Sequence, residues 1–319
     1  MKIFLTGLGF VGTQLVTHLL QSPENELRVV SRTPSKALPA GVHFEQVDSL
    51  EKVTDWRALI GDAEVVIHTA ARVHVMNDSC TDPLDEYRKV NVRGTLALAE
   101  AAAAVGVKRF VFVSSIKVNG EETLPGAPYK ADDVPAPRDP YGISKLEAER
   151  ALQALSANTG MEVVIVRPVL VYGPRVRANF YNMMNWLFKG VPLPLGAINN
   201  KRSLVSIYNL VDFIGVCAKH PGAANQTFLI SDGQDLSTTE LLRKMGRALG
   251  VSVRLIPVPA SMLKLAASML GKSGISQRLC GFLQVDIEKN RQLLNWVPVC
   301  SVEEGLANTA QDFLKGRKV

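Results

Sequence analysis

Residues 2–20 read KIFLTGLGFVGTQLVTHLL, and this stretch decides the fold. Residues 2–6 form a short apolar run that is typical of a buried strand. Residues 11–20 carry apolar side chains at the spacing of a helix. A glycine-rich segment, Thr6–Gly12, joins the two. The stretch therefore predicts a strand, a tight glycine loop and a helix, in that order.

The three glycines of the loop have separate roles. Gly7 permits the tight turn, Gly9 lets the backbone approach a pyrophosphate, and Gly12 lets the helix pack on the strand. The first helical turn, with Phe10 and Val11, offers free N–H groups and the positive end of the helix dipole to phosphates. The same three glycines could also form a tight turn that binds no ligand. The strand before the loop and the helix after it favour a dinucleotide site.

Strand and helix patterns alternate through the first half of the chain. This alternation predicts an α/β fold, a doubly wound parallel sheet with helices on both faces. We expect a dinucleotide-binding domain at 1–167, to which 204–231 returns, and a smaller substrate-binding domain made of 168–203 and 232–319. The expected elements are strands 2–6, 27–31, 42–46, 64–68, 109–113 and 162–166, and helices 11–20, 53–60, 85–105 and 141–158.

A second informative stretch, residues 139–150, reads DPYGISKLEAER, with a proline where a helix would begin. Tyr141 and Lys145 are four residues apart and share one face of that helix, so the ammonium group lies beside the phenol. A nearby cation would lower the phenol pKa from about 10 toward the working pH. Such a phenol can exchange a proton with a carbinol or carbonyl oxygen, and Ser115, at the end of a strand, would hydrogen-bond the same oxygen. The spacing alone is also typical of a solvated helix face; the glycine loop upstream favours catalysis.

The end of the second expected strand bears on the choice of dinucleotide. A carboxylate there would bind the ribose 2′-hydroxyl of NAD, whereas an arginine accommodates the 2′-phosphate of NADP. No Asp or Glu occurs between residues 27 and 44, and Ser31 and Arg32 stand at the strand end. Arg32 could pair with the phosphate, with Ser31 and Lys36 assisting, or it could be a solvated loop residue. We expect NADP, with NAD as the alternative.

Further cofactor contacts are expected at the ends of later strands. Asp48 would lie near the adenine, and the small residues Ala70 and Ala71 would let the middle of the cofactor pass close by. Asn91 could hydrogen-bond the backbone or a ribose near the site, or could make a polar contact within its own helix.

Composition limits the possible partners. The net charge of +6 over 319 residues is modest, and the basic groups lack interleaved aromatic residues, which favours phosphate-bearing small molecules over nucleic acid. The cysteines and histidines show no metal-ligand or redox spacing, so we expect no metal and reduced thiols in a cytoplasmic protein. We expect no signal peptide and no integral membrane segment, because the most apolar later stretch, 258–270, contains Lys264 and is too short to span a bilayer.

The sequence resembles the extended short-chain dehydrogenase/reductases of the nucleotide-sugar epimerase/dehydratase group. The resemblance implies a Rossmann-type fold, a catalytic trio of Ser115, Tyr141 and Lys145, and a role for Lys145 in holding the nicotinamide ribose. It also implies a homodimer that pairs helices 85–105 and 141–158, although both could instead cover the sheet within one subunit. The matching motifs are Thr6–Gly12, Asn91–Thr95, Phe112–Ser115, Tyr141–Lys145, Arg167-Pro168, Val171–Pro174 and Arg202–Asp212.

The resemblance also implies further site residues. Pro168 would border the cofactor, and Lys117 would lie beside the substrate. Asn179 and Arg202 match positions that contact the nucleotide diphosphate, and Arg278 is a further candidate. A guanidinium suits this role because it makes bidentate contacts with phosphate oxygens.

The run SSIKVNGE at 114–121 resembles a subgroup that acts on 4-keto sugar nucleotides in bacterial surface-polysaccharide synthesis. It predicts NADPH-dependent reduction of a UDP-4-keto-6-deoxy-N-acetylhexosamine at C4. The leading alternative is a UDP-glucose or UDP-N-acetylglucosamine 4-epimerase with tightly bound NAD, and a remote one is a non-catalytic NADP-binding regulatory protein. Two departures from the family pattern are the tighter Gly-Leu-Gly turn and Val118-Asn119-Gly120 in place of Val-Tyr-Gly. A dehydratase is disfavoured, because Ile116-Lys117 replaces its acid pair.

Overall fold

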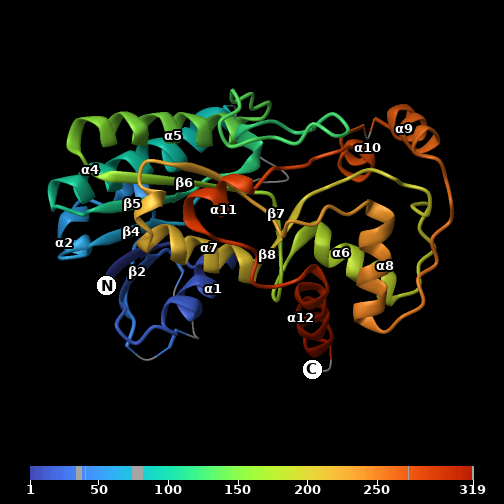
Figure 1. Cartoon of the computed structure of the whole chain (residues 1–319), viewed down its shortest axis with the longest axis horizontal. Helices are drawn as coiled ribbons and strands as arrows, with labels where there is room; N and C mark the ends of the chain where they lie inside the picture. Colours follow the sequence, from blue (N-terminus) through green and yellow to red (C-terminus); the bar gives the residue numbers. More distant parts are fainter. Residues whose placement is uncertain (34–37, 40, 74–81, 272, 318–319) are drawn as a thin grey trace.

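The structure is a computed structural model that describes residues 1–33, 38–39, 41–73, 82–271 and 273–317 (Figure 1). Its centre is a seven-stranded sheet in which every pair of neighbouring strands is parallel, in the order β3-β2-β1-β4-β5-β6-β9. The strands are β1 (Lys2–Thr6), β2 (Glu26–Ser31), β3 (His43–Gln46), β4 (Val65–His68), β5 (Arg109–Val113), β6 (Glu162–Pro168) and β9 (Thr227–Ile230). All six strands predicted for the first half are confirmed, as is the Rossmann-type fold.

The strand order places the ligand crevice. The chain first adds strands on one side of β1 and then crosses to β4 on the other side. Ligands of such sheets bind beyond the carboxyl ends of the strands at this switch point. The glycine loop follows β1 directly, so it lies at the switch point.

Helices cover both faces of the sheet (Figure 1). The helices α1 (Phe10–Leu19) and α7 (Ile207–Lys219) pack into one apolar core, and α2 (Trp56–Ile60), α4 (Thr95–Ala104) and α5 (Pro140–Thr159) pack into the other. Successive side chains of a strand point to opposite faces. On β1, buried Ile3 and Leu5 accordingly enter the first core and Phe4 enters the second.

The predicted helix 85–105 is not continuous. It is divided into α3 (Pro83–Arg88), a wider π-helical turn (Lys89–Gly94) and α4. Short π turns interrupt α-helices most often at functional sites. The buried residue of this turn that faces the site is Asn91, which is described below.

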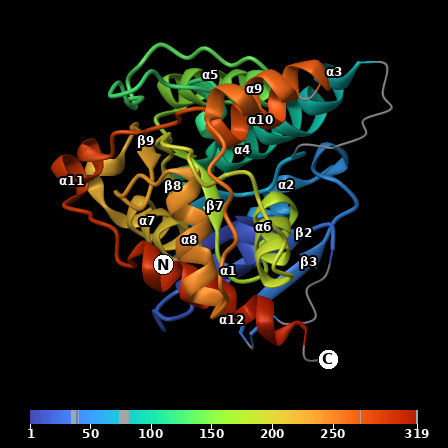
Figure 2. The ribbon, with the colours of Figure 1, turned by 90° about the vertical axis from the view of Figure 1, so that its right-hand side faces the viewer.

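Most of the remaining elements build a third apolar core at the end of the molecule that Figure 2 turns to the viewer, whereas α11 contributes Leu294 to the first core. Residues 204–231 were expected to return to the main sheet: β9 does so, beside β6, whereas β8 pairs with β7 instead. The elements are β7 (Leu170–Tyr172), α6 (Ala178–Phe188), β8 (Leu204–Ser206), α8 (Thr238–Leu249), α9 (Ala260–Met269), α10 (Ser273–Cys280), α11 (Glu288–Leu294) and α12 (Val302–Lys315). The assignment of these segments to a separate substrate domain stays a prediction.

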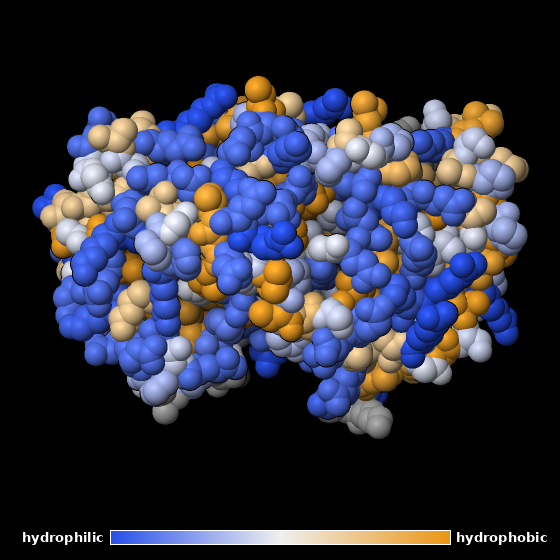
Figure 3. All heavy atoms as spheres, viewed as in Figure 1, coloured by the Kyte–Doolittle hydropathy of each residue, from blue (hydrophilic) through white to orange (hydrophobic). Residues whose placement is uncertain are grey.

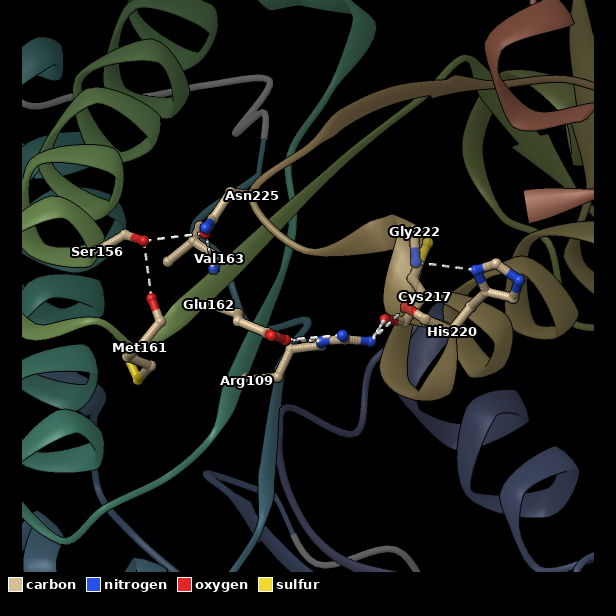
Figure 4. A network of polar contacts seen from close by, with 9 residues as sticks. All are labelled: Arg109, Ser156, Met161, Glu162, Val163, Cys217, His220, Gly222 and Asn225. Carbon is tan, nitrogen blue, oxygen red and sulfur yellow. Dashed lines mark hydrogen bonds and ion pairs between the residues drawn. The ribbon is translucent and has the colours of Figure 1, made fainter. Parts of the chain in front are cut away.

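The amino-terminal edge of the sheet is held by a buried arginine (Figure 4). Arg109, the first residue of β5, pairs with Glu162 at 2.7 Å, and its guanidinium donates to the carbonyl oxygens of Cys217 and His220, both at 2.9 Å. These carbonyls lie at the end of α7, where a cation complements the helix dipole. The contact fixes α7 at the edge opposite the crevice. Within the described residues, no helix combines the length and apolar character needed to cross a bilayer.

Candidate functional site

The glycine loop closes tightly around its own backbone. Gly7 adopts φ +92°, and a Cβ there would stand 2.8 Å from the Cα of Ala70. A Cβ on Gly12 would stand 1.8 Å from the carbonyl oxygen of Gly7. Gly9 differs, because a Cβ there would meet no atom within 4 Å. Two of the glycines are therefore required by the fold, and the third leaves its side of the loop open to a ligand.

The start of α1 fits an anionic group. Gly9 is the N-cap and supplies no side-chain hydrogen bond, and the first turn, with Phe10 and Val11, contains no acidic residue. An uncapped helix N-terminus offers free N–H donors and the positive end of the helix dipole. The residues present therefore fit a dinucleotide pyrophosphate, as the sequence predicted.

The ends of β2 and β3 border the same loop. The Ser31 hydroxyl accepts a hydrogen bond from the Leu8 backbone N–H at 3.4 Å, so it supports the loop. Arg32 and Asp48 are exposed. Both could reach a ligand at this edge, and their roles as cofactor contacts stay predictions. Lys36, the other basic residue named for this position, lies outside the described residues.

Asn91 joins the loop after β4 to helix α5. Its side-chain oxygen accepts from the Arg72 N–H at 2.8 Å, and its amide donates to the Arg72 carbonyl at 3.1 Å and to the Ser144 hydroxyl at 3.0 Å. Ser144 in turn donates to the Tyr141 carbonyl at 2.8 Å. Of the two alternatives left open by the sequence, the backbone contact is present. Asn91 therefore positions the backbone of Arg72 and α5 relative to each other.

Tyr141 and Ser115 are brought together at the end of β5. Asp139 caps α5 by accepting a hydrogen bond from the Gly142 N–H at 2.6 Å, and Pro140 begins the helix. This cap places Tyr141 in the first turn, where its phenol lies near the Ser115 hydroxyl, which lowers the phenol pKa. The ring also packs edge-on against Tyr87, with centroids 6.0 Å apart.

Lys145 is almost completely buried one turn further along α5. Its Nζ donates to the Val113 carbonyl at 2.7 Å and lies 3.9 Å from the centroid of the Phe112 ring. Burial lowers the pKa of Lys145 to about 7, and the Glu149 carboxylate partly opposes this. The amine is therefore divided between its two protonation states near neutral pH.

The expected effect of Lys145 on the phenol was wrong for this structure. Burial raises the pKa of Tyr141 to about 12, the Asp139 carboxylate raises it further, and the nearby Ser115 hydroxyl opposes both. Desolvation disfavours phenolate, and the amine that was expected to offset it is turned to the Val113 carbonyl. The phenol is therefore a protonated donor at neutral pH.

A buried ionic network behind the trio was not predicted. Glu149 receives two hydrogen bonds from Arg167, at 3.0 and 2.6 Å, and one from the Ser114 hydroxyl. Arg167 also donates to the Asn119 side-chain oxygen at 3.0 Å. The network joins α5, the end of β5 and β6. The sequence offered one sign of this network: Glu149 lies four residues after Lys145 and therefore on the same face of the helix.

His68, the last residue of β4, was also missed. It is completely buried, hydrogen-bonds the Thr6 hydroxyl through Nδ1, and lies 3.0 Å from the Thr95 hydroxyl through Nε2. Burial lowers the pKa of His68 to about 3, and the charge of Lys145 lowers it further. His68 is therefore a neutral hydrogen-bonding residue beneath the glycine loop.

Two arginines of the predicted substrate site face a common region. Arg202 donates to the Gly281 carbonyl at 3.2 Å, and burial lowers its pKa. The charge of Arg278 lowers it further, and Glu122 opposes both effects. Two guanidinium groups close enough to repel each other form a suitable setting for a diphosphate.

The other predicted contacts are distributed around the crevice. Lys117 pairs with Asp139 and lies 3.7 Å from Glu121, so its charge already has partners. Pro168 is buried at the end of β6. Asn179 is exposed near the start of α6, where Arg175 of the preceding loop and Ala178, the first residue of the helix, adopt the positive φ angles of 67° and 54°. Non-glycine residues in this conformation often mark functional segments.

Comparison with known proteins gives concordant results. The chain is 50% identical over 317 residues to a UDP-glucose 4-epimerase of Vibrio cholerae, with 98% of this chain and 96% of that protein covered. It superposes with a TM-score of 0.80 on a UDP-glucose 4-epimerase of Thermotoga maritima solved with UDP-glucose, at 24% identity and 99% coverage of both chains. A UDP-glucuronic acid 4-epimerase of Bacillus cereus solved with NAD gives a TM-score of 0.79 at 21% identity, again with 99% of both chains covered.

The model of the NAD dependent epimerase/dehydratase family matches residues 3–231. That span begins in β1, ends just beyond β9, and contains the glycine loop together with Ser115, Tyr141 and Lys145. The match extends over the whole main sheet, and the similarity to the Vibrio cholerae protein extends over nearly the whole chain. The chain therefore belongs to the NAD-dependent epimerase/dehydratase family of enzymes.

Proposed function

We propose that the protein is a 4-epimerase of a UDP-linked hexose or N-acetylhexosamine. The observation that carries this proposal is the neighbouring pair Ser115 and Tyr141, with buried Lys145 one turn further along α5, at the same end of the sheet as the glycine loop. The 50% identity to the Vibrio cholerae UDP-glucose 4-epimerase supports the choice of reaction.

The residues of the chain would transfer one proton to and from the sugar oxygen O4. A bound nicotinamide cofactor would supply the hydride chemistry at C4. Epimerisation begins with Tyr141 as phenolate: it takes the proton from O4 as C4 is oxidised, and returns that proton when the 4-keto group becomes a hydroxyl again. The positive charge of an oxidised nicotinamide beside the ring would favour this phenolate against the effect of burial. Ser115 donates a hydrogen bond to the same oxygen, where negative charge develops. Lys145 fixes the start of α5 against β5 through the Val113 carbonyl.

The substrate's diphosphate would lie between Arg202 and Arg278. These arginines form a cationic pair, in which Arg202 donates to the Gly281 carbonyl and the carboxylate of Glu122 partly offsets the positive charge. Two negative phosphate groups would relieve the repulsion between the guanidinium groups. Asn179 would contribute a further polar contact.

A second candidate is the NADPH-dependent reduction of a UDP-4-keto-6-deoxy-N-acetylhexosamine for surface-polysaccharide synthesis. Two observations favour it. Arg32, rather than a carboxylate, follows β2, and this suits a 2′-phosphate. Tyr141 is protonated at neutral pH, as an acid that completes a reduction must be. A cofactor-binding protein without turnover is disfavoured by the intact trio.

The two reactions can be separated with the purified protein. An epimerase retains its dinucleotide and interconverts UDP-glucose with UDP-galactose, or the corresponding N-acetylhexosamines, without added cofactor. A reductase consumes NADPH in step with loss of the 4-keto sugar. The bound nucleotide is released by denaturation and identified by mass spectrometry, and both assays are followed by NMR. NADPH consumption without cofactor-free interconversion would replace the first proposal with the second.

We also propose a homodimer in the cytoplasm, built by pairing α4 and α5 of two subunits. Both helices lie on one face of the sheet, and α4 is rich in alanine, which permits close helix contact. Light scattering coupled to gel filtration gives the mass. A monomer at micromolar concentration would contradict the dimer.

A further inference from the structure

Helix α9 is apolar on two opposite sides. Leu263 and Ala267 are half-buried and face the body of the protein, where Leu263 packs against the third core. Met262, Leu265 and Met269 follow at the spacing i, i+3 and i+7, which forms a stripe on another side of the helix. Their exposed fractions are 60%, 59% and 77%.

The apolar exposure extends past the end of the helix. Leu270 is 71% exposed, and Ile275, on α10, is 53% exposed. None of the ten residues of α9, all of which the structure describes, is fully buried. Figure 3 shows apolar side chains at the upper right of the molecule, where Figure 1 places α9. A helix that needed only to pack on the protein would be polar on its outer side. Contiguous apolar exposure of this kind marks an interaction surface.

The charge of the surrounding chain is one-sided. Residues 241–285 contain no Asp or Glu and carry seven basic residues, whereas the rest of the chain holds 29 basic and 30 acidic residues and is close to neutral. Residues 241–285 therefore carry a net charge of +7 against −1 for the rest of the chain, and they include α9, α10 and all but the first three residues of α8. Figure 1 shows these three helices on the right-hand side of the molecule. Apart from Arg278, which is assigned above to the diphosphate, the exposed basic residues of the segment are Arg243, Arg247, Arg254 and Lys264.

We propose that α9 and the start of α10 dock on the surface of an anionic lipid bilayer. The stripe Met262, Leu265 and Met269 would enter the boundary between headgroups and acyl chains, and Lys264 and its basic neighbours would face the anionic headgroups. Apolar burial and attraction to anionic lipid together govern the binding of such interfacial helices. This inference goes beyond the proposed function, because none of these three apolar residues belongs to the hydride-transfer site.

A bilayer fits the surface better than a second copy of the chain does. Two copies placed face to face through α9 would bring together two segments that each carry seven basic and no acidic residues. Like charges across an interface oppose association. An anionic bilayer instead complements both the charge and the apolar stripe.

Vesicle sedimentation tests the proposal with the full-length protein. We expect co-sedimentation with phosphatidylglycerol/phosphatidylethanolamine vesicles at low salt, and weaker binding to pure phosphatidylcholine vesicles. Leu265→Gln combined with Met269→Gln should reduce partitioning at least about tenfold, because two large apolar side chains no longer enter the bilayer. Lys264→Gln should reduce it about fivefold on anionic vesicles and little on neutral ones.

Two controls separate docking from misfolding. Val134→Gln removes another highly exposed apolar side chain, 88% exposed and remote in sequence from α9, and should leave partitioning unchanged. Turnover of soluble UDP-sugar should be the same in all these variants, whatever reaction the enzyme performs. Lack of binding by the wild type, or equal binding by the double variant, would overturn the proposal. Concentration-dependent self-association that the double variant abolishes would assign the surface to a second copy instead.

Discussion

At the scale of single residues, burial shifts the pKa values of Tyr141 and Lys145 in opposite directions. Both are removed from water, so the phenol holds its proton more tightly and the ammonium holds its proton more weakly. The tyrosine is thereby prepared to donate a proton. The lysine is held by geometry, between the Val113 carbonyl and the Phe112 ring.

Tyr141→Phe should lower turnover about 10²- to 10⁴-fold, because it removes the proton donor and leaves the ring in place. Binding of the dinucleotide, measured by calorimetry, should change little. Tyr208→Phe, a partly exposed residue of α7, is the control and should retain full activity. Turnover by the Tyr141 variant close to that of the wild type would exclude the phenol as the acid.

Lys145→Met should change how stability depends on pH. The folded-state pKa of Lys145 is lowered to about 7 from 10.5, so between these values the unfolded chain binds more protons than the folded one. Stability therefore rises with pH across this window, and the penalty is fully present below pH 7. From pH 7 to pH 9 the wild type should gain about 2 kcal/mol of unfolding free energy relative to the variant. Urea denaturation at both pH values measures the two unfolding free energies. An equal change in the wild type and the variant would contradict a lowered pKa of Lys145.

At the scale of elements, α5 organises the site. Its N-terminus is capped by Asp139 and presents Tyr141, and its middle carries Lys145 and Glu149 into the protein. Arg167, on β6, anchors the helix through Glu149. A buried pair of this kind destabilises the protein strongly when one partner is removed, because the other charge is left unpaired.

Glu149→Gln should therefore lower the unfolding free energy by about 3 kcal/mol. The matched control is Glu147→Gln on the same helix, whose carboxylate pairs with the half-exposed Arg88 at 2.5 Å. An exposed pair contributes about 0–1 kcal/mol, so the control should be nearly neutral. Chemical denaturation compares the two variants. Equal losses of unfolding free energy would show that the buried pair stabilises the protein no more than the exposed pair does.

At the scale of the whole molecule, one polar network joins the two sheets. Asp232, just after β9, accepts hydrogen bonds from the Tyr172 hydroxyl at 2.8 Å, the Ser206 N–H at 2.7 Å and the Asn209 amide at 2.7 Å. Asn209 also donates to the Cys300 carbonyl at 2.8 Å, ahead of α12. The central sheet, the β7–β8 pair and the C-terminal helix thus share one buried carboxylate.

Tyr172→Phe should lower the unfolding free energy by about 1–3 kcal/mol, because a buried carboxylate loses one donor. The network joins the main sheet to the C-terminal part of the chain, so we expect a single cooperative unfolding transition in the wild type and in the variant. The unfolding curves measured by tryptophan fluorescence and by circular dichroism should then coincide. Separate transitions would show that the parts unfold independently.

The sequence predicted much of the site because its strongest signals are local. The glycine loop, the capped start of α5 and the strand before Ser115 are each contained in a few neighbouring residues, and the structure bears out their backbone forms. The π turn around Asn91 was missed, because the contacts that use it come from Arg72 and Ser144, which are distant in sequence.

The sequence by itself determined the alternating strands and helices, the glycine loop between β1 and α1, and the residue types of the proposed catalytic trio. Hydrophobic period and glycine placement act over a few residues, so they can be read without a fold. Only the tertiary structure decided that Tyr141 stays protonated, that Lys145 turns to the Val113 carbonyl, and that β8 leaves the main sheet. Desolvation and strand pairing depend on which distant segments cover a residue, and that information exists only once the chain has folded.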